Sequence, residues 1–286
     1  GNMDFLLNEL SLCGQFNDID SFLESLAYMI KCIELIHQSG DADMQIYKTT
    51  DFYNCNVTDS IKLCQMKNYG VSDELLKFKR MLDKEIYEEP MWDRNPFHDI
   101  EQRFEWNGKD VSATSLAEAV VRKGTLLSFC LNIFKDCVLS VYNNGKECRI
   151  ISVYSPQYLA EKYRDVLNID RKTFLQVRYD GSRIDCSLVE TKYGPECLEK
   201  SEFQELISTL DKFIQHDSWE TIAVDDGLEY KKYSPGSENW FSGWKYKGKT
   251  IMKFRFSSVL RCFGYRKEDR FRILRIERDH KISDHG

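Results

Sequence analysis

Apolar residues recur at helical spacing in the first part of the chain. Over residues 22–36 they fall three or four positions apart, and Asp18 or Asp20 stands where a helix cap is expected. A second stretch with the same period covers residues 75–86, and Ser72-Asp73-Glu74 stands at its start. The pattern predicts two helices, and we interpret residues 1–110 as an α-rich region.

Alternation of apolar and polar positions takes over in residues 111–200. Asn143-Asn144-Gly145 separates two alternating stretches, and this turn sequence is typical of a β-hairpin. Asp180-Gly181 separates a second pair, FLQVRY and RIDCSLVE. We therefore expect two antiparallel hairpins in this middle region. Helices are predicted beside them, at residues 115–123 and 157–167.

The last region, residues 201–286, begins with a helical pattern and continues as short strands. The helix is expected over about residues 202–216, and the strands at about 219–224, 228–233, 250–256, 259–266 and 270–278. In KFRF, the period of two turns the phenylalanines to one face and Lys253 and Arg255 to the other. The whole pattern predicts an α+β protein, in which an α-rich N-terminal region is followed by antiparallel sheets with packed helices.

Lysine and arginine are concentrated at the end of a chain that is acidic as a whole. Residues 253–286 hold ten Lys or Arg and five Asp or Glu, whereas the formal net charge of the chain is −6. Residues 1–110 hold 11 Lys or Arg and 21 Asp or Glu. So many cations on a small sheet indicate a polyanionic partner, RNA or DNA first. The acidic first region is either a solvated surface or a contact for the basic one.

Composition and motifs exclude several classes of protein. The ten cysteines show no C-x-x-C spacing and mostly stand in apolar stretches, so we expect reduced thiols, no metal site and no cofactor. No run of about eighteen apolar residues and no signal-peptide layout is present. Walker, dinucleotide-binding, hydrolase and kinase motifs are absent. These features predict a cytoplasmic protein without a membrane partner.

The order of elements after residue 200 resembles a known family. A helix is followed by LEYKKYSP, then by KFRFSSVLRCFGYR and then by FRILRIERDHK. This order is similar to the C-terminal half of the RelE/HigB superfamily of bacterial toxin endoribonucleases, in which a basic strand pair precedes an apolar strand and a basic terminal segment. The resemblance covers only residues 201–286, and residues 1–200 resemble no family.

The resemblance implies metal-independent cleavage of RNA, with RNA, the ribosome or an antitoxin-like protein as partners. Such cleavage needs a group that activates the ribose 2′-OH, donors that stabilise the phosphorane, and an acid for the leaving oxygen. By position, the catalytic candidates are Lys253, Arg261, Tyr265 and His280. The phosphate-binding candidates are Arg255, Arg266 and Lys281. Members of the family are mostly short and basic, whereas this chain is long and acidic, so RNA binding without cleavage is the other expectation.

Two tryptophans precede the basic strands. Trp240 and Trp244 flank Phe241 and are followed by Lys245 and Lys247. Aromatic and basic residues interleaved in this way are typical of surfaces that stack single-stranded bases. The same aromatic side chains would also serve to close the core of the last region. The sequence leaves both interpretations open.

The charge pattern supports two hypotheses from different classes. An RNA-cleaving or RNA-binding effector predicts one continuous positive groove, containing Lys253, Arg255, Arg261 and Lys281. A non-catalytic protein-interaction component of a bacterial defence or toxin–immunity system predicts scattered or internally paired cations and an exposed apolar patch. Under the second hypothesis, Arg261 and Arg266 pair with Glu268 or Asp269, and Lys253 and Arg255 are solubilising charges of the sheet.

Overall fold

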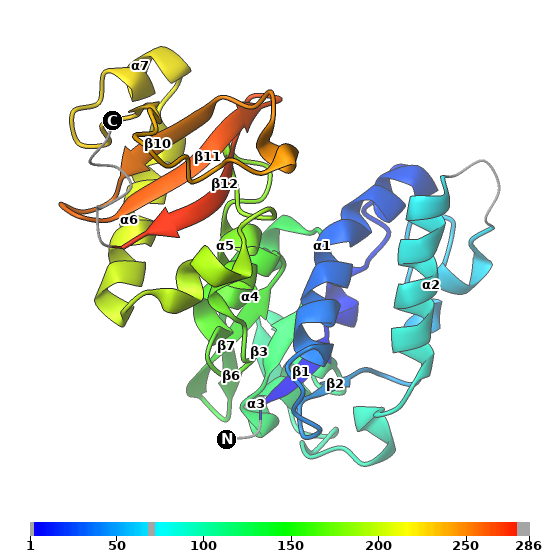
Figure 1. Cartoon of the computed structure of the whole chain (residues 1–286). Helices are drawn as coiled ribbons and strands as arrows, with labels where there is room; N and C mark the ends of the chain where they lie inside the picture. Colours follow the sequence, from blue (N-terminus) through cyan, green and yellow to red (C-terminus); the bar gives the residue numbers. More distant parts are fainter. Residues whose placement is uncertain (1–2, 68–71, 279–286) are drawn as a thin grey trace. The chain divides into compact units, whose positions relative to one another are not determined.

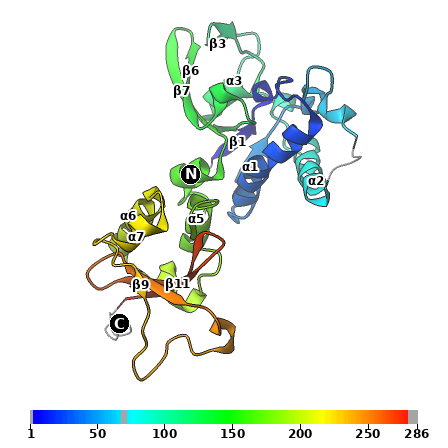
Figure 2. The same cartoon turned by 90° about the horizontal axis from the view of Figure 1, so that it is seen from above.

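The chain folds as two compact units. The computed structural model describes residues 3–67 and 72–278, so His280 and Lys281 lie outside the described residues. Unit 1 comprises Gly1–Ile169 and unit 2 comprises Asp170–Gly286, and each has its own sheet and helices (Figures 1 and 2). The first predicted region and part of the middle one together form unit 1. None of the helices in the described residues is long and apolar enough to span a membrane.

Unit 1 is built on a mixed sheet that contains seven strands among the described residues. Their order is β2 (Gln45–Tyr47), β1 (Asp4–Leu7), β5 (Thr125–Leu127), β7 (Lys146–Val153), β6 (Cys137–Asn143), β3 (Phe104–Trp106) and β4 (Lys109–Asp110). The first four strands are parallel, and the last three are added antiparallel. The α+β class is confirmed. Local turn signals did not predict the parallel pairs, because these pairs join segments that are far apart in the chain. Phe5 of β1, for example, lies opposite Thr125 of β5.

The helices of unit 1 begin at capping residues that the sequence displays. They are α1 (Ile19–His37), α2 (Asp73–Tyr87), α3 (Ser115–Arg122) and α4 (Pro156–Tyr163). The Asp18 side chain accepts a hydrogen bond from the Ser21 amide, and the Ser72 hydroxyl accepts one from the Leu75 amide. The predicted hairpin is also confirmed, with Asn144 and Gly145 at φ values of 53° and 75° between β6 and β7.

Unit 2 contains a second mixed sheet, with five strands among the described residues. Their order is β8 (Ile184–Asp185), β12 (Arg270–Glu277), β11 (Arg261–Lys267), β10 (Ile251–Arg255) and β9 (Lys231–Lys232). Strands β9 to β12 are antiparallel, and β8 is parallel to β12. The helices are α5 (Arg171–Arg178), α6 (Lys200–Gln215) and α7 (Trp219–Ala223). Strands β9 to β12 and α6 therefore lie where the sequence predicts them, whereas the residues of β8 were expected in a hairpin of the middle region.

Two predicted strands of unit 2 are helices instead. FLQVRY belongs to α5, so the second predicted hairpin does not form, and residues 219–224 contain α7. The physical reason is capping: Asp170 accepts a hydrogen bond from the Thr173 amide, and Ser218 accepts one from the Thr221 amide. Apolar residues in segments this short are compatible with the spacing of a helix or of a strand, and the capping residues select the helix.

Apolar side chains cover both faces of the unit 2 sheet. On one face, Phe213 of α6 packs against Phe254 and Phe271, with ring centroids 5.0 and 5.9 Å away. On the other face, side chains of the segment 233–251 pack on the strands. This cluster consists of Tyr233, Phe241, Tyr246, Ile251, Phe263 and Leu274. Among the described residues, apolar side chains therefore pack on both faces of the central strands of this sheet.

A bulge interrupts the pairing of β11 with β12. The register shifts between Phe263 and Gly264, and a Cβ atom at Gly264 would lie 2.0 Å from the Arg272 carbonyl oxygen. Only glycine can occupy this position, because no side chain fits so close to the neighbouring strand. Bulges bend a strand and redirect the next side chain, which here is Tyr265.

Candidate nucleic-acid interface

Lys253 and Arg261, the two central catalytic candidates, are buried. Their exposed fractions are 2% and 7%. Lys253 lies opposite Phe263 in the β10–β11 pairing, on the face that the segment 233–251 covers. The expectation of an exposed basic face was wrong at Lys253, because alternation along a strand separates two faces without showing that one is solvated.

Arg261 is held by its own strand surroundings. Its Nη1 atom donates to the carbonyl oxygens of Ser257 and Leu260, at 2.9 and 3.1 Å. Across the β11–β12 pairing it lies opposite Glu277, whose exposed fraction is 3%. A guanidinium used in this way organises the turn between β10 and β11. It does not reach a surface where RNA could bind.

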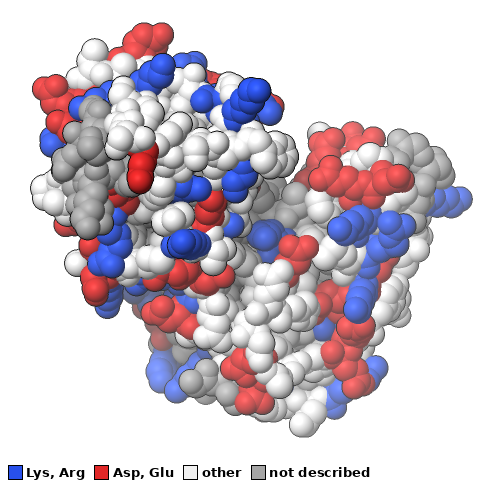
Figure 3. Space-filling model, in the orientation of Figure 1, with Lys and Arg blue, Asp and Glu red and all other residues white. Residues whose placement is uncertain are grey.

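Most other arginines of these strands hold unit 2 together. Arg255 donates to the carbonyl oxygens of Gly227 and Asp226 at 3.0 and 3.2 Å, and it lies 3.4 Å from Glu229. Three further pairs join β12, and Arg278 directly after it, to preceding segments. They are Arg272–Asp185 at 2.8 Å, Arg275–Glu190 at 2.7 Å and Arg278–Glu202 at 3.0 Å. On the face of unit 2 in Figure 3, cationic and acidic side chains of the described residues are interspersed.

Arg275 and Trp240 belong to one packed group. The guanidinium of Arg275 lies over Trp240, 5.0 Å from the ring centroid, and donates to the Trp240 carbonyl oxygen at 2.6 Å. Burial alone would lower the pKa of Arg275, but its hydrogen bonds with Glu190 raise that pKa above the usual value. Trp240 also makes an edge contact with Phe263 at 5.2 Å. Trp240 thus closes the core, the second of the two interpretations.

Trp244 is placed differently, because 89% of its surface is exposed. It begins the short 3-10 helix Trp244–Tyr246, between the core residues Phe241 and Tyr246. Because Phe241 and Tyr246 are packed in the core, the backbone between them is held in place, and the Trp244 indole points into solvent from a fixed position. An exposed, anchored indole is suited to stacking on a flat ligand.

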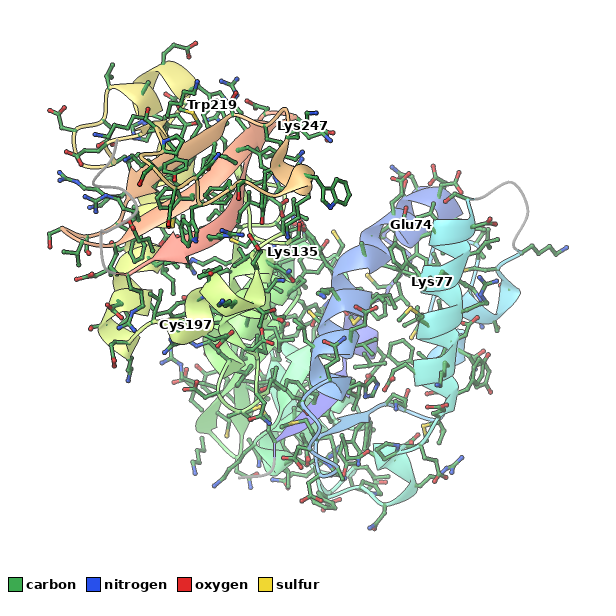
Figure 4. All side chains as sticks on the ribbon, in the orientation of Figure 1. Glu74, Lys77, Lys135, Cys197, Trp219 and Lys247 are labelled. Carbon is green, nitrogen blue, oxygen red and sulfur yellow. The ribbon has the colours of Figure 1, made fainter. Side chains whose placement is uncertain are left out.

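Two adjoining pockets lie in the described part of unit 2, and Trp244 lines the first of them. The first has a volume of about 390 Å³ and is lined by Trp244, Lys232 and Lys247 among others. The second has a volume of about 530 Å³ and includes Tyr265, Arg266 and Lys267. Lys249 and Thr250 line both pockets, and Lys247 is labelled in Figure 4. We call the residues that line these two pockets the lysine–aromatic surface.

The lysine–aromatic surface has a distinct electrostatic character. Five of its residues are cations, namely Lys232, Lys247, Lys249, Arg266 and Lys267. No lining residue of either pocket is Asp or Glu. Arg266 lies 4.0 Å from the carboxylate of Asp269, which lines neither pocket. Such a surface attracts anions, and its aromatic residues offer flat faces.

Aromatic rings hold two of these cations in place. The Lys249 ammonium lies 4.3 Å from the centroid of the Tyr265 ring. The Arg266 guanidinium lies 4.2 Å from the ring of Trp219, which is labelled in Figure 4. Cation–π contacts orient a charge without using its N–H donors. Both cations can therefore still donate hydrogen bonds to a ligand.

The structure divides the predicted site residues into two groups. Tyr265, Arg266 and Trp244 line the adjoining pockets, whereas Lys253, Arg255, Arg261 and Trp240 do not. Sequence reasoning missed Lys232, Lys249 and Lys267 as site residues. The signal for Lys249 was the run WKYKGK, in which lysine alternates with other residues directly after the exposed tryptophan.

Unit 1 contains a buried carboxyl group that sequence reasoning also missed. Glu9 follows β1, and its Oε1 atom accepts a hydrogen bond from the Ser115 amide at 2.8 Å, at the start of α3. Burial raises the pKa of Glu9, although the Ser115 donors oppose that shift. No group of His, Cys, Asp and Glu among the described residues could hold a metal ion. The observed contact gives Glu9 a structural role, which is to tie α3 to the end of β1.

A comparison with known proteins gives no match: no family model, no curated protein and no solved structure corresponds to this chain. The resemblance to the RelE/HigB superfamily therefore stays a prediction. The arguments below rest on the geometry of unit 2 alone.

Proposed function

We propose that unit 2 binds RNA at the lysine–aromatic surface. The observation that carries this proposal is the pair of adjoining pockets with five lining cations, no lining carboxylate and an exposed tryptophan. Lysines neutralise phosphates, and an exposed indole stacks on a base. Both contributions are needed for RNA to be preferred over simple anions.

The proposal concerns binding, and it assigns no cleavage step to Lys253 or Arg261. A general acid or base must reach the proton that it transfers, either directly or through one water. Lys253 and Arg261 are covered by the protein, and Arg255 is engaged with backbone carbonyls. Ribosome and antitoxin-like partners remain predictions of the resemblance.

The internal pairing of the strand arginines favours a second candidate, a non-catalytic protein-interaction component. Arg272, Arg275 and Arg278 each contact a carboxylate of unit 2. The same exposed lysines would then meet an acidic protein surface. We rank this candidate second, because an acidic protein surface does not by itself call for an indole beside the pockets.

The test measures binding of a labelled single-stranded RNA by fluorescence anisotropy, in EDTA, across a salt series. We expect the wild type to bind and the double variant Lys247→Gln/Lys249→Gln to bind at least tenfold more weakly at low salt. The slope of log affinity against log salt should fall by about 0.7 for each phosphate contact that is lost.

The matched control is Lys200→Gln/Lys212→Gln. Both lysines are exposed on α6 of the same unit and line neither pocket. Their substitution removes the same total charge as the first double variant. The control should bind RNA with nearly wild-type affinity. Equal losses in both double variants would show attraction by net charge alone. No binding by the wild type would overturn the proposal and favour the protein-partner candidate.

A further inference from the structure

The two pockets differ in what they offer a ligand, although they share Lys249 and Thr250. The second pocket brings Lys249, Arg266 and Lys267 to one place, and two of these cations are oriented by rings. The first pocket adds Trp244, the most exposed large aromatic side chain of the described residues. Three cations line each pocket, so both attract negative charge, but the exposed indole lines only the first, and two of the three cations of the second are oriented by rings.

We infer that the surface binds an unpaired nucleotide, with its phosphate in the second pocket and its base against Trp244. This inference rests on the proposed function and goes further, since it names the form of nucleic acid and the place of each part. Lys249 lies where the two pockets meet, so it contacts the phosphate that joins the base in the first pocket to the rest of the strand. Duplex RNA is excluded from this mode, because its bases are stacked on each other and cannot reach the indole.

Tyr265 acts in this arrangement as a positioning residue. Its ring lies beneath the Lys249 ammonium and also packs against the apolar cluster of the sheet. The bulge at Gly264 sets the direction of Tyr265, so the position of the phosphate contact depends on the strand pairing. This explains how a flexible lysine on an exposed loop is held ready for a ligand.

The experiment compares three probes with the full chain and its variants. They are a short labelled oligouridine, the same strand annealed to its complement, and inorganic tripolyphosphate as an anion without a base. Trp244→Ala should weaken oligouridine binding by about 5- to 100-fold, as expected for the loss of one stacked base, and leave tripolyphosphate unchanged. Lys249→Gln should weaken both. The wild type should prefer the single strand to the duplex.

Two variants of Tyr265 test its positioning role. Tyr265→Phe keeps the ring and should bind both oligouridine and tripolyphosphate like the wild type. Tyr265→Leu keeps an apolar side chain but removes the ring, and should weaken both by about two- to fivefold, the scale of an exposed cation–π contact. Equal losses in the two variants would assign the effect to the hydroxyl and overturn the positioning role.

Failure of the inference and failure of the proposed function give different results. If the wild type binds oligouridine but Trp244→Ala does so equally well, the base subsite is wrong while RNA binding stands. Equal affinity of the wild type for duplex and single strand also overturns the inference alone. If the wild type binds tripolyphosphate but neither RNA, both the inference and the proposed function fail.

Discussion

Strands β10 to β12 and the segment 231–249 are both basic, yet they use their cations in opposite ways. The strands carry mostly arginines, and these are buried or paired with carbonyls and carboxylates of unit 2, except Arg266, which lines the second pocket. The segment carries lysines and no arginine, and its lysines are exposed. They are Lys231, Lys232, Lys245, Lys247 and Lys249. The number of cations in a segment therefore does not show how much positive surface it presents.

The side-chain chemistry explains this division. A guanidinium is planar and has five donors, so it can satisfy several acceptors at once when water is excluded. Arg275 does this with the Glu190 carboxylate, the Trp240 carbonyl and the Tyr246 hydroxyl. A lysine ammonium is strongly hydrated and is stabilised at the surface instead. The sequence predicted a polyanionic partner mainly from the arginines of the strands, whereas the positive charge exposed to solvent comes mainly from the lysines of the segment 231–249.

The largest expected effect comes from Arg275→Leu. It removes the cation of a largely buried pair and leaves Glu190 without its closest cationic partner. Breaking such a pair typically costs several kcal/mol, and we expect the free energy of unfolding of unit 2 to fall by about 3 kcal/mol. Urea unfolding followed by circular dichroism measures this change.

Lys245→Gln is the matched control at the same carboxylate. Lys245 lies 3.6 Å from Glu190, but 58% of its side chain is exposed. Its removal should leave the urea midpoint unchanged, because exposed pairs contribute little. If the two variants lost equal stability, the contrast between buried arginines and exposed lysines would be wrong.

Local signals predicted much of the fold. The caps at Asp18 and Ser72 located α1 and α2, and Asn144-Gly145 located the hairpin of β6 and β7. Each of these signals depends on residues close together in the chain. The parallel pairs of unit 1 could not be predicted in this way, because β1 and β5 meet only in the folded sheet.

The site was predicted only in part, for a related reason. The alternation in KFRF separates Lys253 from Phe254, but it gives no information about which face another segment covers. The covering residues Phe241 and Tyr246 belong to a loop without a regular pattern. Trp244 was identified from its neighbours in the chain, whereas the pairing of Lys249 with Tyr265 joins two segments and has no sequence signature.

A second, smaller effect distinguishes the two tryptophans of this loop. Trp240→Ala should lower the free energy of unfolding of unit 2 by about 2 kcal/mol, because the partly buried indole packs against Phe263 and Arg275. Trp244→Ala should leave stability unchanged, since its side chain is almost fully exposed. Thermal unfolding of both variants checks this. A destabilised Trp244 variant would mean that the indole packs on the protein and is not free for a base.

The smallest effect extends the comparison to unit 1, where one carboxylate again has a buried and an exposed cationic partner. Glu85 lies 3.5 Å from the ammonium of Lys48, whose side chain is 1% exposed, and 2.9 Å from Nε2 of the half-exposed His37. The hydrogen bond with Glu85 raises the pKa of His37 above 6.5. Burial would raise the pKa of Glu85, but His37 and Lys48 hold it below 4.5.

These two shifts give opposite pH dependences. The stability that unit 1 gains from the raised pKa of His37 is complete below pH 6.5 and is lost as the pH rises through that pKa. The stability gained from the lowered pKa of Glu85 is complete above pH 4.5 and is lost as the pH falls through that pKa. We therefore expect His37→Gln to lower the urea midpoint at pH 5.5 and to have little effect at pH 9. Substitution of the half-exposed Lys31 on the same helix, Lys31→Gln, should show no such dependence. If His37→Gln lowered the midpoint equally at both pH values, the ring would act through packing, and its charge would contribute nothing to the stability of unit 1.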